Sequence, residues 1–205
     1  MSAADVRAFL ELLAAQMWSM RAGEMPKGYN FSGIQDFVAD QGVTYAGARL
    51  SAEHLAIVHR AIDRCSHQFR VKQCFYNAQS LALADETRTL RYVEGFAQGR
   101  AVIAVNHAWV TIGDTGAVVD LTWRLAPEDE WRSGRMRDRP MGEVPEGWAY
   151  IGTLFDTDLI RDRWLATGQS VSMLDNWEDH YPVLKRERRN AKPDHSAFDT
   201  LRQWT

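Results

Sequence analysis

Alternating hydrophobic positions in the middle of the chain predict a β-hairpin. Residues 113–116 (GDTG) are typical of a turn between two β-rich runs. Closing this turn symmetrically pairs Ile112 with Ala117 and His107 with Thr122. Because successive side chains on a strand point to opposite faces, one face of the hairpin is entirely apolar. It collects Ala108, Val110, Ile112, Ala117, Val119 and Leu121.

The opposite face of this hairpin carries candidate chemistry. It collects His107, Trp109, Thr111, Val118, Asp120 and Thr122. His107 and Asp120 are diagonal neighbours across the two strands, where Cα atoms lie roughly 7–8 Å apart and long side chains meet. The pattern therefore predicts an imidazole held by a carboxylate. A histidine on a strand is more often structural than catalytic, so a function needs a further partner.

Cys74 is that partner, because small and apolar residues after it predict a mostly buried helix. The cysteine stands in the first turn, where the positive end of the helix favours a thiolate. Backbone N–H groups at the same end are donors to a developing oxyanion. A free cysteine is most often a small buried hydrophobe. With His107 as base and Asp120 orienting it, however, the three residues predict a thiol triad.

The remaining periodicity predicts an α+β fold. Apolar residues at helical spacing predict helices at 2–21, 51–65, 34–39 and 156–165, the last one ended by Gly168. β-rich runs predict a small antiparallel sheet with the helices packed on one side, from strands near 90–97, 102–112, 117–124 and 149–155. Glu94 on the first strand is expected to be exposed to solvent.

The sequence around the triad resembles a known enzyme family. A cysteine on a buried helix, followed by RYVEGFA, HAWV and VVDLTW, resembles the transglutaminase-like branch of the papain-like cysteine enzymes. The resemblance covers residues 74–123. It implies a papain-like or transglutaminase-like core with Cys74 as nucleophile, His107 as general base and Asp120 as orienting acid. Leu121 stands where proline is common in the family, and Lys72 precedes the cysteine where glycine is frequent.

These features favour a cysteine-dependent hydrolase, a peptidase or amidase, that cleaves an amide bond through an acyl-thioester on Cys74. Water is the favoured acceptor because no second acceptor site is evident. A transglutaminase-type acyl transferase that uses an amine acceptor stays open, as does an inactive member acting as a protein-binding module. The expected partner is a peptide, a protein or another amide-containing molecule, and no cofactor is expected.

Other residues are weaker candidates for the site. Gln68 and Gln73 lie shortly before the cysteine, and either amide can donate to an oxyanion, although a polar residue on an approach loop explains both. The aromatic residues Tyr76, Tyr92, Trp109 and Trp123 are candidate walls for a substrate, and core packing explains them equally well. The long segment 125–147 is either a lid or a solvated insertion.

Composition narrows the class of protein. At 205 residues the chain is expected to be one domain, with a core at 51–155 and a charged tail at about 185–205. A net charge of -3 gives no reason to expect a nucleic-acid partner, and no stretch is long and apolar enough for a membrane span. Two cysteines are too few for a disulfide scaffold, so a reducing cytoplasm is the expected location.

Two further classes of site are disfavoured. Asp5, Arg7 and Glu11 interrupt the apolar residues at the start of the chain, so this segment is not typical of a signal peptide. His54 and His59 are five residues apart, whereas a helical zinc site uses a spacing of four. We therefore expect no metal site and assign these histidines to the surface.

Overall fold

The computed structural model describes residues 2–20, 24–65, 69–99, 103–113, 115–125, 136–137 and 139–189. Within these residues five strands form one sheet in the order β1-β5-β2-β3-β4, and all neighbouring strands are antiparallel. The strands are β1 (Val43–Tyr45), β2 (Leu90–Gln98), β3 (Val105–Ile112), β4 (Val118–Val119) and β5 (Ala149–Phe155). The mixture of helices with an antiparallel sheet confirms the α+β class. The sequence pattern does not predict β1, which is only three residues long.

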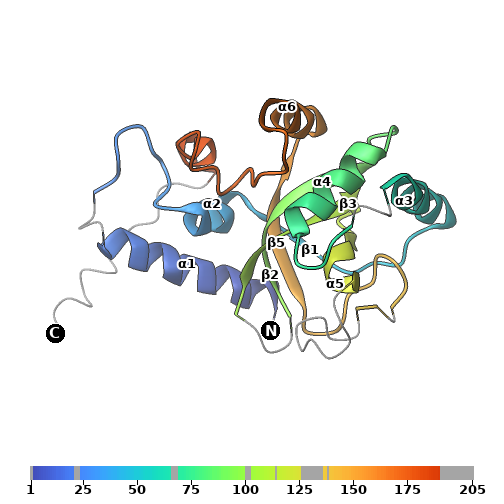
Figure 1. Ribbon diagram of the computed structural model, residues 1–205. Helices are drawn as coiled ribbons and strands as arrows, with labels where there is room; N and C mark the ends of the chain where they lie inside the picture. The colour runs from blue at the N-terminus through green and yellow to red at the C-terminus, as the bar shows by residue number, and fades with distance from the viewer. Residues whose placement is uncertain are drawn as a thin grey trace.

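The helices of the described residues are α1 (Ala3–Met20), α2 (Ile34–Gln41), α3 (Ala52–Cys65), α4 (Cys74–Ala84), α5 (Leu121–Leu125), α6 (Thr157–Thr167) and the 3-10 helix η2 (Pro182–Lys185). Three of them, α1, α2 and α4, pack directly on one face of the sheet, which we call the outer face, whereas α3, α5 and α6 pack mainly on α4. Helix α4 packs on β2 and β3, whereas α1 and α2 pack on β5, as Figure 1 shows. Five of the helices match the predicted ranges to within a few residues, and α5 does not.

The sheet curls until its two edges meet. The N–H of Ala46, just after β1, donates to the Gly116 carbonyl at 3.2 Å, and the N–H of Val118 in β4 donates to the Ala46 carbonyl at 3.2 Å. The enclosed side, which we call the inner face, has its own apolar cluster: Tyr45, Val93, Ala97, Trp109, Val118, Met136 and Tyr150. Both faces of the strands are therefore buried, and the hairpin lies between two cores.

The hairpin register is the one that the alternating pattern predicts. Val110 pairs with Val119 and Thr111 pairs with Val118. All six residues of the predicted apolar face belong to the cluster between sheet and helices. Gly113 and Gly116 have φ angles of 49° and 70°, a region that glycine enters without steric cost, so the turn uses both.

The predicted strand at 117–124 is too long, because α5 begins at Leu121. Thr122 consequently does not pair with His107. The cause is Asp120, whose Oδ1 accepts the backbone N–H of Trp123 at 3.2 Å. A carboxylate that accepts an N–H from the first turn is a strong N-terminal cap and starts the helix there.

Glu94 is also corrected, because it is fully buried instead of exposed. Its carboxylate accepts hydrogen bonds from the Tyr92 hydroxyl, the Ser172 hydroxyl and the backbone N–H groups of Met173 and Leu174. Burial raises the pKa of Glu94, and these four donors act in the opposite direction. The carboxylate thereby fastens residues 172–174 onto the outer face of the sheet.

The two long segments without predicted regular structure are partly described. Nearly half of the candidate lid 125–147, namely residues 126–135 and 138, lies outside the described residues. The described later part of this segment is tied to α5, since the Arg124 guanidinium donates to the carbonyls of Arg139 and Pro140 at 2.6 and 2.7 Å. Whether residues 125–147 act as a lid stays a prediction.

The predicted charged tail at 185–205 is described as far as residue 189. There Arg188 makes a 2.6 Å ion pair with Asp36 of α2, and the N–H of Arg189 donates to the Asp40 carboxylate at 2.8 Å. The apolar residues expected to tie down the end of the tail, Phe198, Leu201 and Trp204, lie outside the described residues.

Candidate active site

Cys74 is the first residue of α4, as the sequence predicts. Its approach loop is sharply bent, because Lys72 has a φ of 65° and the N–H of Gln73 donates back to the Arg70 carbonyl at 3.4 Å. The cysteine is 9% exposed, so it lies at the boundary between the core and solvent. This position places the thiol beside a helix N-terminus that has no side-chain cap from Gln73.

His107 on β3 is held by a carboxylate. Its Nε2 lies 2.6 Å from Asp120 Oδ2, and both side chains are almost completely buried. The imidazole stacks on the indole of Trp123, with ring centroids 4.4 Å apart and an interplanar angle of 16°. The diagonal contact predicted from the hairpin register is therefore present, and one aromatic ring fixes the plane of the imidazole.

Asp120 is oriented by more than the histidine. The Tyr150 hydroxyl donates to Oδ2 at 3.1 Å, and the N–H of Trp123 donates to Oδ1 at 3.2 Å. Burial, the charge of Asp120 and this hydrogen bond all raise the pKa of Tyr150 well above its ordinary value, so the phenol keeps its proton. A carboxylate with three donors has one preferred orientation and presents it to the His107 ring.

Cys74, the third residue of the predicted triad, lies next to the imidazole of His107. Its interaction with the imidazole contributes to raising the pKa of His107. Because Nε2 faces Asp120, Nδ1 is the ring nitrogen left for the sulfur. Burial opposes a charge on the imidazole, but the negative charge of Asp120, its hydrogen bond and Cys74 outweigh that effect and raise the pKa of His107 to about 10.

This shift predicts how the stability of the fold depends on pH. The folded-state pKa of His107, about 10, exceeds the ordinary value of 6.5, so protonation stabilises the native state. The contribution is complete below pH 6.5 and is lost as the pH rises toward 10. Urea denaturation between pH 6 and 10.5 should therefore show a larger decrease in the free energy of unfolding for the native protein than for Asp120→Asn, because the variant lacks the ion pair. If the free energy of unfolding fell equally with pH in both proteins, the coupling between His107 and Asp120 would be contradicted.

Comparison with protein families, curated proteins and solved structures gave a single result. No match was found. The resemblance to transglutaminase-like enzymes therefore stays a prediction from motifs, and any function proposed for the chain depends on the geometry of the described residues.

The other candidate residues differ in their access to the thiol. Gln68 lies outside the described residues. Gln73 is exposed, and its side chain makes no capping hydrogen bond to α4, so it is available to a ligand. Trp109 is 1% exposed and packs between Tyr45 and Tyr150, which leaves almost no surface for a substrate.

Tyr92 does not form a wall for a substrate either. Its side chain is fully buried, and its hydroxyl accepts from Gln79 at 3.1 Å while donating to Glu94. Tyr92 therefore serves the core between the sheet and α4 and offers no surface to a ligand.

Two candidate aromatic residues keep partly open surfaces. Trp123 is half-buried, with one ring face on His107 and its edge against Trp148 at 4.5 Å between centroids. Tyr76 is half-buried and packs against Trp164 of α6 at 5.7 Å. Both remain candidates for substrate contact, in contrast to Trp109.

Sequence reasoning missed two supports of the triad. Tyr150 comes from β5, and its contact with Asp120 depends on the curling of the sheet. Asn77 links α4 to the segment that follows Asp120, because its side chain donates to Thr122 Oγ1 at 2.9 Å. A polar residue at a position expected to be buried within α4 is the signal that would have singled out Asn77.

A cavity of about 560 Å³ lies near these residues without including the triad. It is lined by residues 44–49 and 143–149, together with Ala3. Its closest link to the site is Trp148, which contacts Trp123 and through it the imidazole. The cavity is thus separated from His107 by two aromatic rings.

Neither a metal site nor a membrane-spanning helix is found in the part of the chain that the structure describes. Among the described residues, no group of three or more histidine, cysteine, aspartate or glutamate side chains could hold a metal ion. None of the helices described is long and apolar enough to cross a membrane.

Proposed function

We propose that the protein is a cysteine-dependent hydrolase that cleaves an amide bond, with a papain-like or transglutaminase-like arrangement of its core. One observation carries the proposal: the His107 ring is hydrogen-bonded to Asp120, and Cys74, at the start of α4, interacts with the same ring and helps to raise its pKa. An imidazole held between an acid and a thiol is the arrangement that activates a sulfur nucleophile.

In the first half of the reaction, the Cys74 thiolate attacks the carbonyl carbon of the amide. The negative charge that develops on the oxygen is stabilised by backbone N–H groups in the first turn of α4. The C–N bond then breaks, and His107 gives a proton to the departing amine. The product is an acyl-thioester on Cys74, with Asp120 keeping Nε2 engaged so that Nδ1 is aimed at the reacting atoms.

In the second half, a water molecule attacks the acyl-thioester while His107 accepts its proton. Collapse of the tetrahedral intermediate releases a carboxylic acid and restores the thiolate, and His107 ends protonated as it began. An amine in place of water would give acyl transfer by the same steps. Detection of the released acid, as opposed to a new amide, distinguishes these two outcomes.

The alkylation rate of each cysteine tests the proposal. Cys65 is a built-in control, because burial raises its pKa to about 11 and its thiol donates to the Ala61 carbonyl. At pH 7 iodoacetamide should modify Cys74 at least about 100-fold faster than Cys65, because only a thiolate attacks rapidly. Mass spectrometry of the native protein gives both rates.

Equal and slow modification of the two thiols, with the fold intact by circular dichroism, would contradict an activated nucleophile. It would favour the alternative of an inactive protein-binding module. Rapid modification of Cys74 that persists unchanged in His107→Ala would contradict the assignment of His107 as its base.

A further inference from the structure

The loop before the nucleophile carries an arginine whose charge is not neutralised. Arg70 is exposed, and its guanidinium has no carboxylate partner among the described residues. Residues 69–84 contain Arg70 and Lys72 but no aspartate or glutamate. The exposed Arg70 guanidinium therefore places a positive charge beside the approach to Cys74, and the N-terminus of α4 acts in the same direction.

Arg70 is held in place relative to the triad. Its N–H donates to Asn77 Oδ1 at 2.9 Å, and its carbonyl accepts from Asn77 Nδ2 at 2.7 Å. Asn77 is 1% exposed, lies one helical turn after Cys74, and also donates to Thr122. One buried side chain thus ties the backbone of Arg70 to the helix of the nucleophile and to the segment that follows Asp120.

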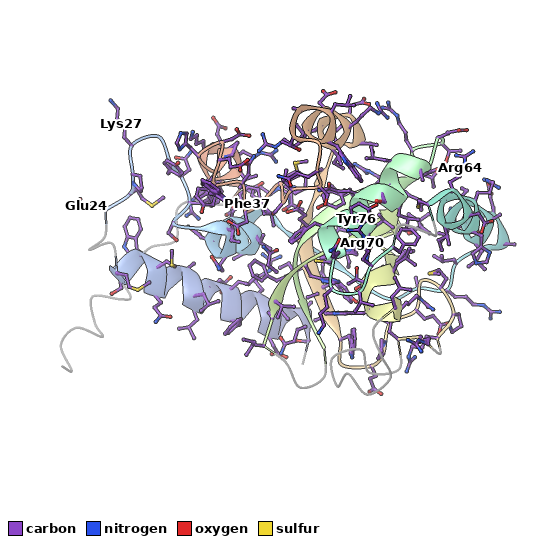
Figure 2. The ribbon with its side chains drawn as sticks, viewed as in Figure 1. Glu24, Lys27, Phe37, Arg64, Arg70 and Tyr76 are labelled. Atoms are coloured by element: carbon purple, nitrogen blue, oxygen red, sulfur yellow. The ribbon has the colours of Figure 1, made fainter. Side chains whose placement is uncertain are left out.

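The side chain of Arg70 is positioned as well. Its guanidinium carbon lies 5.3 Å from the centroid of the Tyr76 ring, and Tyr76 packs in turn on Trp164. Figure 2 labels Arg70 and Tyr76 together at α4, in front of the sheet. Stacking on an aromatic ring leaves the N–H groups at the edge of the guanidinium free to bind a planar anion.

We propose that Arg70 binds a carboxylate of the substrate close to the scissile amide, so that acidic peptides are the preferred substrate class. This inference rests on the proposed hydrolase function. Guanidinium and carboxylate form paired N–H···O hydrogen bonds, which gives both attraction and orientation. The carboxylate belongs to an aspartate or glutamate side chain or to the free C-terminus of a peptide, and reactive dipeptides of both kinds separate these two sources.

The test compares two reagents of similar size, iodoacetate and iodoacetamide. In both reactions the Cys74 sulfur displaces iodide, but only iodoacetate carries a carboxylate. The rate with iodoacetamide reports activation of the thiol. The ratio of the iodoacetate rate to the iodoacetamide rate reports recognition of the negative charge. In Arg70→Gln we expect the ratio to fall about threefold to tenfold at low salt, because one nearby positive charge is removed. The difference should disappear at about 1 M salt.

Arg64→Gln is the control for distance, since it also removes one exposed arginine, although this one is paired with Glu86 at 3.2 Å. The Arg64 guanidinium donates to the Ala84 carbonyl at the opposite end of α4, roughly 15 Å along the helix from Cys74. Figure 2 labels it toward that end. The ratio of the iodoacetate rate to the iodoacetamide rate in Arg64→Gln should equal that of the native protein. Arg70→Lys should retain part of the preference for iodoacetate. An unchanged ratio in Arg70→Gln, with rapid iodoacetamide modification, would overturn the role of Arg70 and leave the proposed function standing.

Bromoacetyl dipeptides identify the source of the carboxylate. Bromoacetyl-Gly-Glu-amide is compared with bromoacetyl-Gly-Gln-amide, and bromoacetyl-Gly-Gly acid with its amide. Preference for the glutamate probe indicates a side-chain carboxylate, and preference for the free acid indicates a C-terminal one. The same rates for all four probes would overturn the proposal.

If iodoacetamide modifies Cys74 no faster than Cys65, the proposed function fails, and carboxylate binding is judged separately. The side-chain NMR signal of Arg70 is then titrated with N-acetyl-Glu-amide and N-acetyl-Gln-amide. A saturable shift with the glutamate compound alone supports an acidic ligand. The absence of any shift overturns it.

Discussion

We expect hydrolysis of an amide substrate to disappear in Cys74→Ser and to persist in Cys65→Ser. We expect the first substitution to lower turnover by about 10³-fold or more, because a serine hydroxyl is not ionised at neutral pH and the unit of three residues fails when one member is lost. The Cys65 thiol donates a hydrogen bond to the Ala61 carbonyl within α3, and a serine hydroxyl can donate the same bond, so serine should be tolerated there. Release of acid from a mixture of acidic and neutral peptides, followed by mass spectrometry, measures both variants.

Two further observations make this comparison sharper. An acyl group trapped from the same peptides should be found on Cys74 of the native protein and should be absent from Cys74→Ser. Equal loss of turnover in both cysteine variants, with the melting temperature unchanged, would contradict Cys74 as the single nucleophile.

The hairpin that places His107 beside Asp120 could be predicted because its signals are local. The two turn glycines are a strong signal, and a slip by one residue would move the whole apolar set to the wrong face. The helix of Cys74 was predictable for a similar reason, since its apolar run directly follows the cysteine. Each of these signals lies within a few residues of the element that it specifies.

The start of α5 was not predicted, because Asp120 has two roles that compete in the sequence pattern. Alternation continues through Thr122 and favours a longer strand, whereas an aspartate three residues before Trp123 is a capping signal. The cap prevails in the fold. The result keeps Asp120 beside His107 and frees Thr122 to bind Asn77 in place of a strand partner.

Contacts between distant strands were beyond prediction from the sequence. Tyr150 reaches Asp120 only because the sheet curls, and the order β1-β5-β2-β3-β4 is not encoded by any local motif. Glu94 was misassigned for the same reason: its burial depends on residues 172–174, nearly 80 positions later in the chain. The family resemblance concerned the local motifs, and neither of these long-range contacts follows from it.

Substitutions at the consecutive residues Val119, Asp120 and Leu121 should affect activity and stability differently, because the side chains of these residues have different surroundings. Asp120→Asn should still fold, since asparagine is also a good cap for α5, although it loses the stability that the ion pair with His107 contributes. It should nevertheless lower turnover by about 10²–10⁴, the range over which a mispositioned imidazole weakens a triad. Turnover and melting temperature, measured on the same preparation, give both quantities.

Val119→Asp and Leu121→Asp should have the opposite signature. Val119 is 1% exposed and Leu121 is 9% exposed, and both pack in the cluster between the sheet and the helices. A carboxylate placed there has no partner, so we expect a loss of about 3 kcal/mol or more and, for Val119, an unfolded domain. Full activity of Asp120→Asn would show that His107 does not depend on this carboxylate. A native melting temperature for both aspartate variants would mean that the two side chains do not face the core, and the register that brings His107 and Asp120 together would then be wrong.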